Sequence, residues 1–287
     1  MKTAEQYLDS IAPPDQIDDV NDDDLAVCPV CHEKTQTYFV WNDRKKIVHC
    51  MCKCERDKVA AEEEERRRAE KMSRIREMKA AGLQDPMLRA YTFENDRGDN
   101  PAMNKARMYV KNWKDFYVEN IGLLLVGPVG TGKTFFAGCV ANALLDQAVP
   151  VLMTNFPKIL NSLGGMFSED RNKYINSLNE FDLLIIDDLG IERSTDFALE
   201  QVYSVVDARY RSGKPMIFTT NLSVTDMKKA ASDDIRFARI YDRILEMCQP
   251  ILFAGKNYRK ENAARKKART IELLMEEDDI ILPKMLK

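Results

Sequence analysis

The sequence has no apolar segment long enough to cross a membrane. Its longest apolar runs, IGLLLVG (121–127) and LLIIDDLG (183–190), fall far short of the roughly 20 residues that a spanning helix needs. The N-terminal stretch MKTAEQYLDSIAPPDQ also lacks the apolar core of a secretory signal. These absences predict a cytoplasmic protein with no membrane partner. Because cytosolic thiols stay reduced, they also argue against a disulfide framework for the seven cysteines.

Charged residues are distributed unevenly along the chain, although the net charge is only −3. Residues 1–25 carry eight acidic side chains against Lys2, and residues 255–269 carry seven basic side chains against Glu261. The acidic stretch is interrupted by proline and predicts a short helix followed by a loose arm. The basic stretch is a candidate contact for the phosphates of nucleic acid, or equally a solvated helix face.

Residues 55–80 predict a charged helix, because they contain neither Gly nor Pro. Three pairs place an acid four residues before a base, which favours a solvent-exposed helix; they are Glu62–Arg66, Glu63–Arg67 and Glu64–Arg68. The acids and bases of this helix nearly balance, so a spacer is preferred over a nucleic-acid patch. Gly82 and Pro86 then end the pattern.

From residue 102 onward, apolar runs alternate with helical patterns, beginning with one amphipathic helix over 102–118. The candidate strands are short and apolar; they are GLLLVG (122–127), VPVLMTN (149–155), DLLIIDD (182–188) and KPMIFTTN (214–221). This alternation predicts an α/β fold with a parallel sheet covered by helices on both faces. A helical region over roughly 233–275 is expected to follow the sheet.

GPVGTGKT (127–134) fits the phosphate-binding pattern G-x-x-x-x-G-K-[ST], and it lies between an apolar strand and a helix as that motif requires. Its glycines let backbone N–H groups turn toward phosphate oxygens, and the helix N-terminus adds a positive dipole end. We expect Lys133 to reach the β- and γ-phosphates of ATP and the Thr134 hydroxyl to ligate Mg²⁺. The expected nucleotide-binding residues are Gly127, Pro128, Val129, Gly130, Thr131, Gly132, Lys133, Thr134 and Phe135.

Two acids and an amide follow the later strands. Asp187 comes first after LLII and is expected to hold Mg²⁺ through water, while Asp188 orients or deprotonates the attacking water. An acid at the second position is commonly Glu, and the shorter Asp188 predicts slow hydrolysis. Asn221 ends its strand where it could sense the γ-phosphate, although a helix cap is the alternative.

These residues together resemble an AAA+ ATPase, and more narrowly the replicative helicase loaders of the DnaC/DnaI type, phage-encoded members included. The resemblance rests on GPVGTGKT, LLIIDDLG, FTTN, RIYDRI and NYR in that order, and covers about residues 90–265. It implies oligomerisation through AAA+ interfaces, contacts with single-stranded DNA and a hexameric replicative helicase as partner. It also implies that Arg243 is an arginine finger supplied in trans, with Arg239 second, and that Arg259 contacts nucleotide in cis. From spacing alone, each of these arginines is an ordinary salt-bridge residue.

A cysteine cluster precedes the charged helix. C-x-x-C and C-x-C-x-C lie eighteen residues apart, close to a zinc-site spacing, and the candidate ligands are Cys28, Cys31, His32, His49, Cys50, Cys52 and Cys54. A module this small needs a metal to fold, although reactive or redox thiols are the alternative. The resemblance to loaders implies Cys28, Cys31, Cys52 and Cys54, with Cys50 or His49 as a substitute. Cys139 and Cys248 fall in helical patterns and are expected to be buried apolar residues.

We therefore expect three parts: an acidic arm and zinc module over 1–54, a linker helix over 55–89 and an AAA+ ATPase domain over 90–287. The expected function is ATP-dependent helicase loading, with Zn²⁺, ATP and Mg²⁺ as cofactors. The zinc module would bind the helicase and the AAA+ core would bind single-stranded DNA, where Phe167 is a candidate for base stacking. The transposition helpers related to IstB generally lack a cysteine-rich front end, so the cysteines favour the loader. Such a helper remains an alternative, as does a helicase-binding adaptor whose ATPase is a slow switch.

Overall fold

The computed structural model describes residues 25–41, 44–190 and 195–278, and the chain divides into two compact units, Met1–Ser73 and Arg74–Lys287. The short helix and arm expected over residues 1–25 lie almost wholly outside the described residues. Within the described part, no helix combines the length and apolarity needed to span a membrane.

The first unit contains a two-stranded hairpin and the start of the charged helix. Strands β1 (Gln36–Trp41) and β2 (Arg44–His49) pair antiparallel, and α2 (Lys53–Gly82) begins shortly after them. The prediction of a helix over 55–80 is therefore confirmed. Of the three expected pairs, Glu63 and Arg67 lie within ion-pair distance, 4.0 Å apart. Both side chains are more than half exposed, so the pair contributes little to stability.

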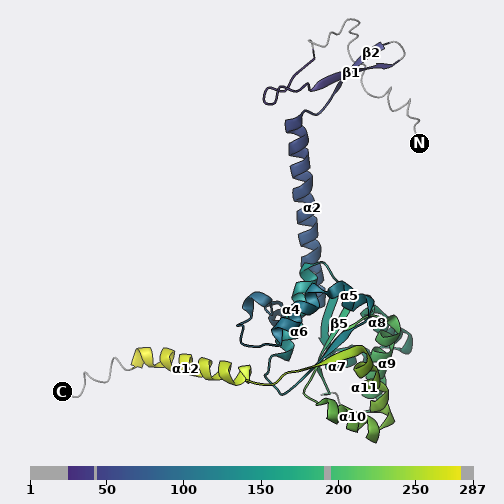
Figure 1. The fold of residues 1–287 in the computed structure, drawn as a ribbon, viewed down its shortest axis with the longest axis vertical. Coiled ribbons are helices and arrows are strands. Elements are labelled where there is room, and N and C mark those ends of the chain that lie inside the picture. The colour runs from purple at the N-terminus through teal and green to yellow at the C-terminus, as the bar shows by residue number, and fades with distance from the viewer. Residues whose placement is uncertain (1–24, 42–43, 191–194, 279–287) are drawn as a thin grey trace, which may run out of the picture. The chain divides into compact units, whose positions relative to one another are not determined.

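The second unit is built on a five-stranded parallel sheet in the order β4-β5-β6-β3-β7 (Figure 1). Its strands are β3 (Gly122–Val126), β4 (Val151–Asn155), β5 (Leu183–Leu189), β6 (Met216–Thr220) and β7 (Cys248–Leu252). The first four coincide with the predicted strands. Because β6 lies between β3 and β5, the polar residues that follow these three strands meet at one edge of the sheet.

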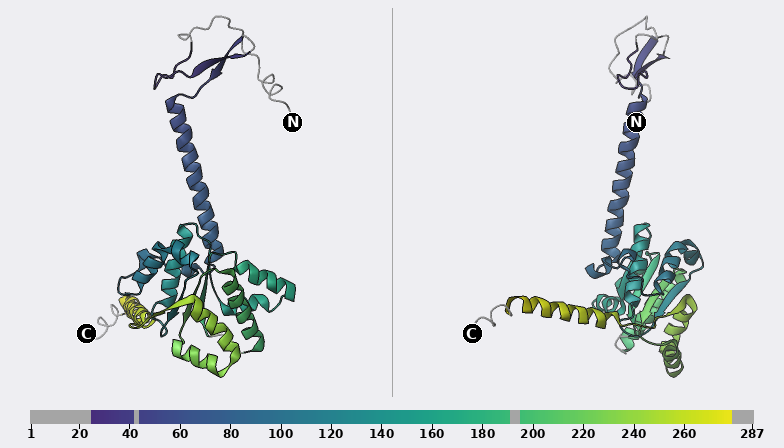
Figure 2. Two further views of the ribbon diagram at one scale, coloured as in Figure 1. Left: turned by 45° about the vertical axis from the view of Figure 1, so that its right-hand side comes forward. Right: turned by 60° about the vertical axis from the view of Figure 1, so that its left-hand side comes forward.

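Helices cover both faces of this sheet, which confirms the predicted α/β class (Figure 2). Side chains alternate along β3: Leu124 packs toward α7, α8, α9 and α11, and Leu125 packs toward α4, α5 and α6. The helical elements are α3 (Pro86–Arg89), η2 (Phe93–Asn95), α4 (Met103–Lys111), α5 (Trp113–Val118), α6 (Lys133–Asp146), α7 (Phe156–Leu163), α8 (Ser168–Leu178), α9 (Asp196–Ser212), α10 (Val224–Asp233), α11 (Ile235–Met247) and α12 (Tyr258–Asp278).

Two expectations about secondary structure are wrong. The helix predicted over 102–118 breaks at Asn112, whose backbone (φ −103°, ψ 24°) leaves the helical region between α4 and α5. The helical region predicted over 233–275 is interrupted by β7, so Cys248 begins a strand and is buried there rather than in a helix. Pro250 explains this strand, because proline breaks a helix interior but is tolerated on a sheet edge.

Candidate functional site

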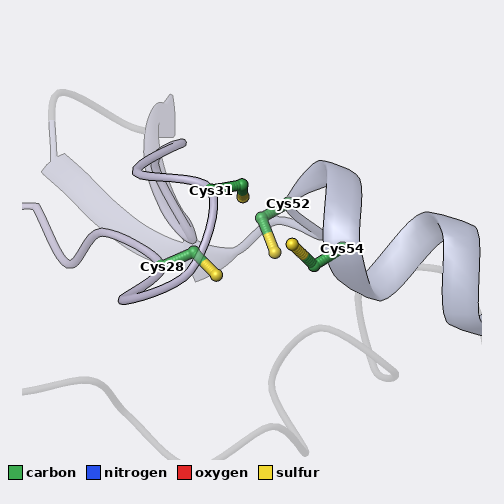
Figure 3. Close-up of side chains that lie close together, drawn as sticks. All are labelled: Cys28, Cys31, Cys52 and Cys54. Carbon is green, nitrogen blue, oxygen red and sulfur yellow. The ribbon is translucent and has the colours of Figure 1, made fainter.

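Four cysteines converge in the first unit. The sulfur atoms of Cys28, Cys31, Cys52 and Cys54 all lie within 4.8 Å of one another (Figure 3). Tetrahedral zinc with Zn–S bonds of about 2.3 Å holds its sulfurs about 3.8 Å apart, so this cluster fits the ion with small adjustments. The set is the one that the resemblance implied. Its positions at the entry of the hairpin and at the start of α2 mean that a metal would join these two elements.

The substitute ligands lie elsewhere. The Cys50 thiol donates to the carbonyl of Lys34 (3.4 Å), and Nε2 of His49 contacts Glu55 (3.1 Å). Within the cluster, the backbone N–H groups of Glu33 and Cys54 lower the pKa of the Cys31 thiol to about 6. Sharing a hydrogen bond with Cys31 raises the pKa of Cys54 to about 12. The cluster therefore already favours one thiolate near neutral pH, and thiolate is the form that binds metal.

The glycine-rich loop connects β3 to α6 in the second unit. Gly130 and Gly132 adopt positive φ angles of 84° and 94°, a conformation that side-chain-bearing residues rarely take. Lys133, the first residue of α6, folds back so that its Nζ donates to the carbonyls of Gly127 (2.6 Å) and Pro128 (2.9 Å). Burial lowers the pKa of this ammonium. Lys133 thus lies inside the loop, where the motif predicts a phosphate contact.

Asp187 and Asp188 lie at the end of β5 in a bulge, where the register with β6 shifts between Ile186 and Leu189. Oδ1 of Asp187 accepts hydrogen bonds from the hydroxyls of Thr134 (3.1 Å) and Thr219 (2.6 Å). Burial raises the pKa of Asp187. The arrangement joins the two residues expected at Mg²⁺, Thr134 and Asp187, and a hard cation held there would find only oxygen ligands.

The bulge also sets the direction of Asp188. Its backbone has φ 56°, and its N–H donates to the hydroxyl of Thr219 (2.9 Å). In a regular strand, neighbouring side chains point to opposite faces, whereas a bulge re-aims one of them. Asp188 therefore lines the same cavity as Lys133 and Thr134. Thr219 holds both acids, a role that sequence reasoning missed because it depends on the pairing of β5 with β6.

Asn221 follows β6 and contacts Lys133, since its Oδ1 accepts from Lys133 Nζ at 2.8 Å. The helix-cap alternative does not apply, because α10 begins after Ser223, whose own side chain caps it. Asn221 lies between the glycine-rich loop and the acids of β5, as expected of a γ-phosphate sensor.

A cavity of about 470 Å³ extends from the glycine-rich loop. One wall is the segment from Ala90 to Met103, which carries no recognisable motif and was missed by sequence reasoning. The segment is fixed to α6: the amide of Asn142 donates to the carbonyls of Leu88 (2.9 Å) and Tyr91 (3.0 Å). A Cβ on Gly138 would lie 2.7 Å from the Tyr91 side chain, so this contact requires glycine. The volume is within the range of small-molecule sites.

The three arginines named by the resemblance lie in different surroundings. Arg259, in the first turn of α12, lines the cavity. Arg243 is instead packed against α9, 3.0 Å from Asp207 and over the rings of Tyr203 and Tyr210. Arg239, one turn earlier in α11, is exposed. Arg259 alone of the three therefore shares the cavity with Lys133.

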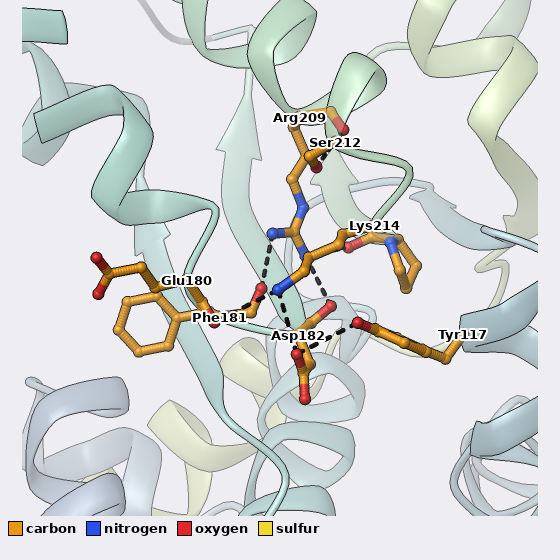
Figure 4. Close-up of polar contacts among 8 residues, drawn as sticks. Tyr117, Glu180, Phe181, Asp182, Arg209, Ser212 and Lys214 are labelled. Atoms are coloured by element: carbon orange, nitrogen blue, oxygen red, sulfur yellow. Dashed lines mark hydrogen bonds and ion pairs between the residues drawn. The ribbon is translucent and has the colours of Figure 1, made fainter. Parts of the chain in front are cut away.

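At the opposite end of the same strands, a buried arginine holds β5 and β6 in register (Figure 4). The Arg209 guanidinium donates to the carbonyls of Phe181 (2.7 Å), Asp182 (2.7 Å) and Pro215 (2.9 Å). Burial lowers its pKa to about 10, which leaves it charged at neutral pH. Since Phe181 and Asp182 precede β5 and Pro215 precedes β6, Arg209 fixes the strands that carry the acids and Asn221.

The candidate DNA-binding residues are exposed. Phe167 precedes α8 with 83% of its surface accessible. Most of the basic stretch, residues 258–269, forms the first half of α12, where residues 263–269 are all exposed.

The fold and this site define a P-loop ATP-binding domain of the AAA+ class. Residues 51–267 match the family of IstB-like ATP binding proteins, and the chain belongs to that family.

Two curated relatives are named as replicative helicase loaders. The chain is similar to DnaI of Bacillus subtilis (strain 168), with 26% identity over 63% of this chain and 62% of that protein. It is also similar to DnaC of Escherichia coli (strain K12), with 28% identity over 63% of this chain and 72% of that protein. The match thus spans less than two thirds of DnaI. A crystal structure of the DnaC helicase loader superposes with a TM-score of 0.50 at 23% identity, covering 59% of this chain and 100% of that one, which supports the fold.

Proposed function

We propose that this chain is an ATP-dependent loader of a hexameric replicative helicase. The proposal rests on two hydrogen bonds that bring the motifs together, Lys133 to Asn221 (2.8 Å) and Thr134 to Asp187 (3.1 Å). It also rests on the relatives, two of which are named as helicase loaders. The proposed parts are a zinc module over 1–54, a linker helix over 55–89 and an AAA+ ATPase domain over 90–287, in a cytosolic setting.

ATP would bind with its phosphates over the glycine-rich loop and the remainder in the cavity beside Ala90–Met103. Lys133 would hold the β- and γ-phosphates, and Arg259 would contact the nucleotide from α12. Thr134 and Asp187 would hold Mg²⁺, which when bound would neutralise phosphate charge. Asp188 would orient the attacking water. Asn221, which is hydrogen-bonded to Lys133, would sense whether the γ-phosphate is present.

Completion of the site would require a second copy of the chain. An arginine from a neighbouring subunit, Arg243 or Arg239, would stabilise the charge that develops during hydrolysis. ATP binding would then favour assembly, and hydrolysis would favour release. This coupling makes the ATPase rate depend on protein concentration.

The zinc module would bind the helicase, and the AAA+ core would bind single-stranded DNA through Phe167 and the basic first half of α12. Phosphate neutralisation by these Lys and Arg residues would make DNA affinity fall as salt rises. An affinity that stays constant between low and high salt would contradict this part of the proposal.

The decisive experiment is a loading assay with the full chain, a purified replicative helicase and closed single-stranded DNA circles. We expect helicase on the circles only when ATP and the chain are both present. Lys133→Ala should abolish loading but retain helicase binding. Stoichiometric loading by Lys133→Ala would support the adaptor alternative instead. Binding to a transposase rather than to the helicase would identify an IstB-like transposition helper.

A further inference from the structure

The first turn of α12 is hydrogen-bonded to the glycine-rich loop. Nδ2 of Asn257 donates to the carbonyl of Val129 (3.0 Å), and the backbone N–H of Tyr258 donates to the carbonyl of Gly130 (2.9 Å). A third carbonyl, that of Thr131, accepts more weakly from the Asn100 amide at 3.5 Å. Three successive carbonyls of the loop thus point toward groups outside it.

This direction determines where the loop's N–H groups point. The carbonyl of one residue and the N–H of the next belong to one planar trans peptide, so they point in opposite directions. Holding the carbonyls of Val129 and Gly130 toward α12 therefore turns the N–H groups of Gly130 and Thr131 away from it. Within the residues that the structure describes, neither of these two N–H groups donates to a protein acceptor. Both are available to an anion in the loop.

Asn257 contacts the loop so closely that it restricts the sequence there. A Cβ on Gly130 would lie 2.2 Å from Oδ1 of Asn257, and Gly130 has a φ of 84°. The same Oδ1 accepts from the N–H of Lys260 (3.1 Å), which makes Asn257 the N-terminal cap of α12. One side chain therefore begins the helix with its oxygen and holds the loop with its nitrogen.

We propose that Asn257 and the backbone N–H of Tyr258 are positioning groups for phosphate binding: they hold the peptides of the glycine-rich loop in the orientation that presents the N–H groups of Gly130 and Thr131 to the nucleotide. The proposal rests on the proposed function only in assuming that the loop binds ATP. It has a consequence for α12, because the helix and the phosphate loop then form one hydrogen-bonded unit.

Two substitutions remove the contacts with the loop while leaving α12 folded. Asn257→Ser keeps a good helix cap but is too short to reach Val129, so α12 should remain folded while the loop loses one donor. Tyr258→Pro removes the N–H that holds Gly130, at the first helical position, where proline is well tolerated. Its matched control is Tyr258→Ala, which also removes the ring and its hydroxyl contact with Asp99 but keeps the N–H.

The measurement is the dissociation constant of a fluorescent ATP analogue, together with the melting temperature of the nucleotide-free protein. We expect Asn257→Ser to weaken binding roughly fivefold, as loss of one hydrogen bond of about 1 kcal/mol implies. Tyr258→Pro should bind roughly fivefold more weakly than Tyr258→Ala. The melting temperature of Asn257→Ser should fall by no more than the roughly 2–4 °C that one hydrogen bond of about 1 kcal/mol implies, because Ser keeps the cap of α12.

Each outcome decides the proposal. If the wild-type chain binds the analogue and both comparisons show equal affinities, the positioning role is wrong while the proposed function stands. If every variant loses affinity and also melts more than about 4 °C lower, beyond what one hydrogen bond explains, the contacts are only structural and the positioning role is again wrong. If the wild-type chain does not bind the analogue, the proposed function fails, and the positioning role fails with it.

Discussion

The Thr134 hydroxyl donates to Oδ1 of Asp187 across 3.1 Å and so joins the first turn of α6 to the end of β5. A second hydroxyl, that of Thr219, donates to the same oxygen at 2.6 Å. Two strands and one helix therefore meet at a single carboxylate oxygen. The proposed magnesium ligands, Thr134 and Asp187, are therefore already in position in the absence of nucleotide, and binding requires little rearrangement of their side chains.

Replacing Asp187 with Asn should separate catalysis from stability. We expect Asp187→Asn to lower the ATPase rate about a hundredfold or more, because a metal contributes several kcal/mol to stabilising transition-state charge. In metal-free buffer at pH 7, the same variant should melt at a higher temperature than wild type, since a mostly buried negative charge is removed while both hydroxyl donors keep an oxygen acceptor. Asp115→Asn, an exposed control, should change neither quantity. A lower melting temperature for Asp187→Asn would contradict the buried-charge argument.

Zinc content should distinguish Cys52 from Cys50. We expect the full chain to bind about one zinc per molecule through four thiolates, with Cys52→Ser losing most of it. Cys50→Ser should retain it, because the Cys50 thiol contacts the Lys34 carbonyl outside the four-sulfur cluster. Metal analysis after dialysis, with thiol accessibility as a second readout, measures both. Equal zinc loss in the two variants would mean that Cys50 is a ligand after all.

Arg209 should contribute much more to the free energy of unfolding than an exposed charged residue does. Arg209→Ala would remove the guanidinium donors from the carbonyls of Phe181, Asp182 and Pro215, and Pro215 would keep only a weak bond from the Leu184 N–H at 3.5 Å. We expect a loss of about 3–5 kcal/mol in the free energy of unfolding. Arg211→Ala, on the same helix, removes an exposed guanidinium whose partner Asp207 still pairs with Arg243, and it should cost less than about 1 kcal/mol. Denaturant titration of both variants tests the difference. Similar midpoints would show that the three carbonyls find water instead.

The two candidate arginine fingers should behave differently. Arg243 is paired with Asp207 and only 27% of its side chain is exposed, so Arg243→Ala should destabilise the isolated subunit. Arg239 is exposed, and Arg239→Ala should leave the melting temperature unchanged. The proposed trans-acting residue is the one whose variant binds ATP normally but recovers hydrolysis when mixed with Lys133→Ala subunits. Recovery by neither variant would exclude both as fingers.

The parts of the site that the sequence predicted are short motifs at strand ends. Asp187 follows an apolar run directly, Asn221 ends the strand pattern MIFTTN, and Lys133 belongs to the glycine-rich motif that follows IGLLLV. Parallel strands bring their carboxyl ends to one edge of a sheet. Thr219 could not be assigned its role in the same way, because its contact with Asp187 depends on the bulge in β5 and on pairing with β6. Local sequence does not encode such pairing.

The wall of the cavity was missed for a related reason. The segment from Ala90 to Met103 has no motif of its own, and it reaches the site only because Tyr91 packs on Gly138 and Asn142 binds its backbone. Each contact joins residues that are more than 45 positions apart. By contrast, the sequence itself indicates the break at β7, since Pro250 disfavours the continuous helix predicted there.

Pro250 also bears on how copies of this chain can meet. The N–H of Phe253 donates to Val126 of β3, and backbone directions alternate along a strand, so the nitrogen of Pro250 faces the open side of β7. That nitrogen carries no hydrogen, so a further strand added at this border would lack one backbone hydrogen bond near the middle of β7. Extension of the sheet from one molecule to the next is thereby disfavoured at β7. A second copy of the chain that approached this border of the sheet would therefore have to contact it through side chains rather than through backbone pairing.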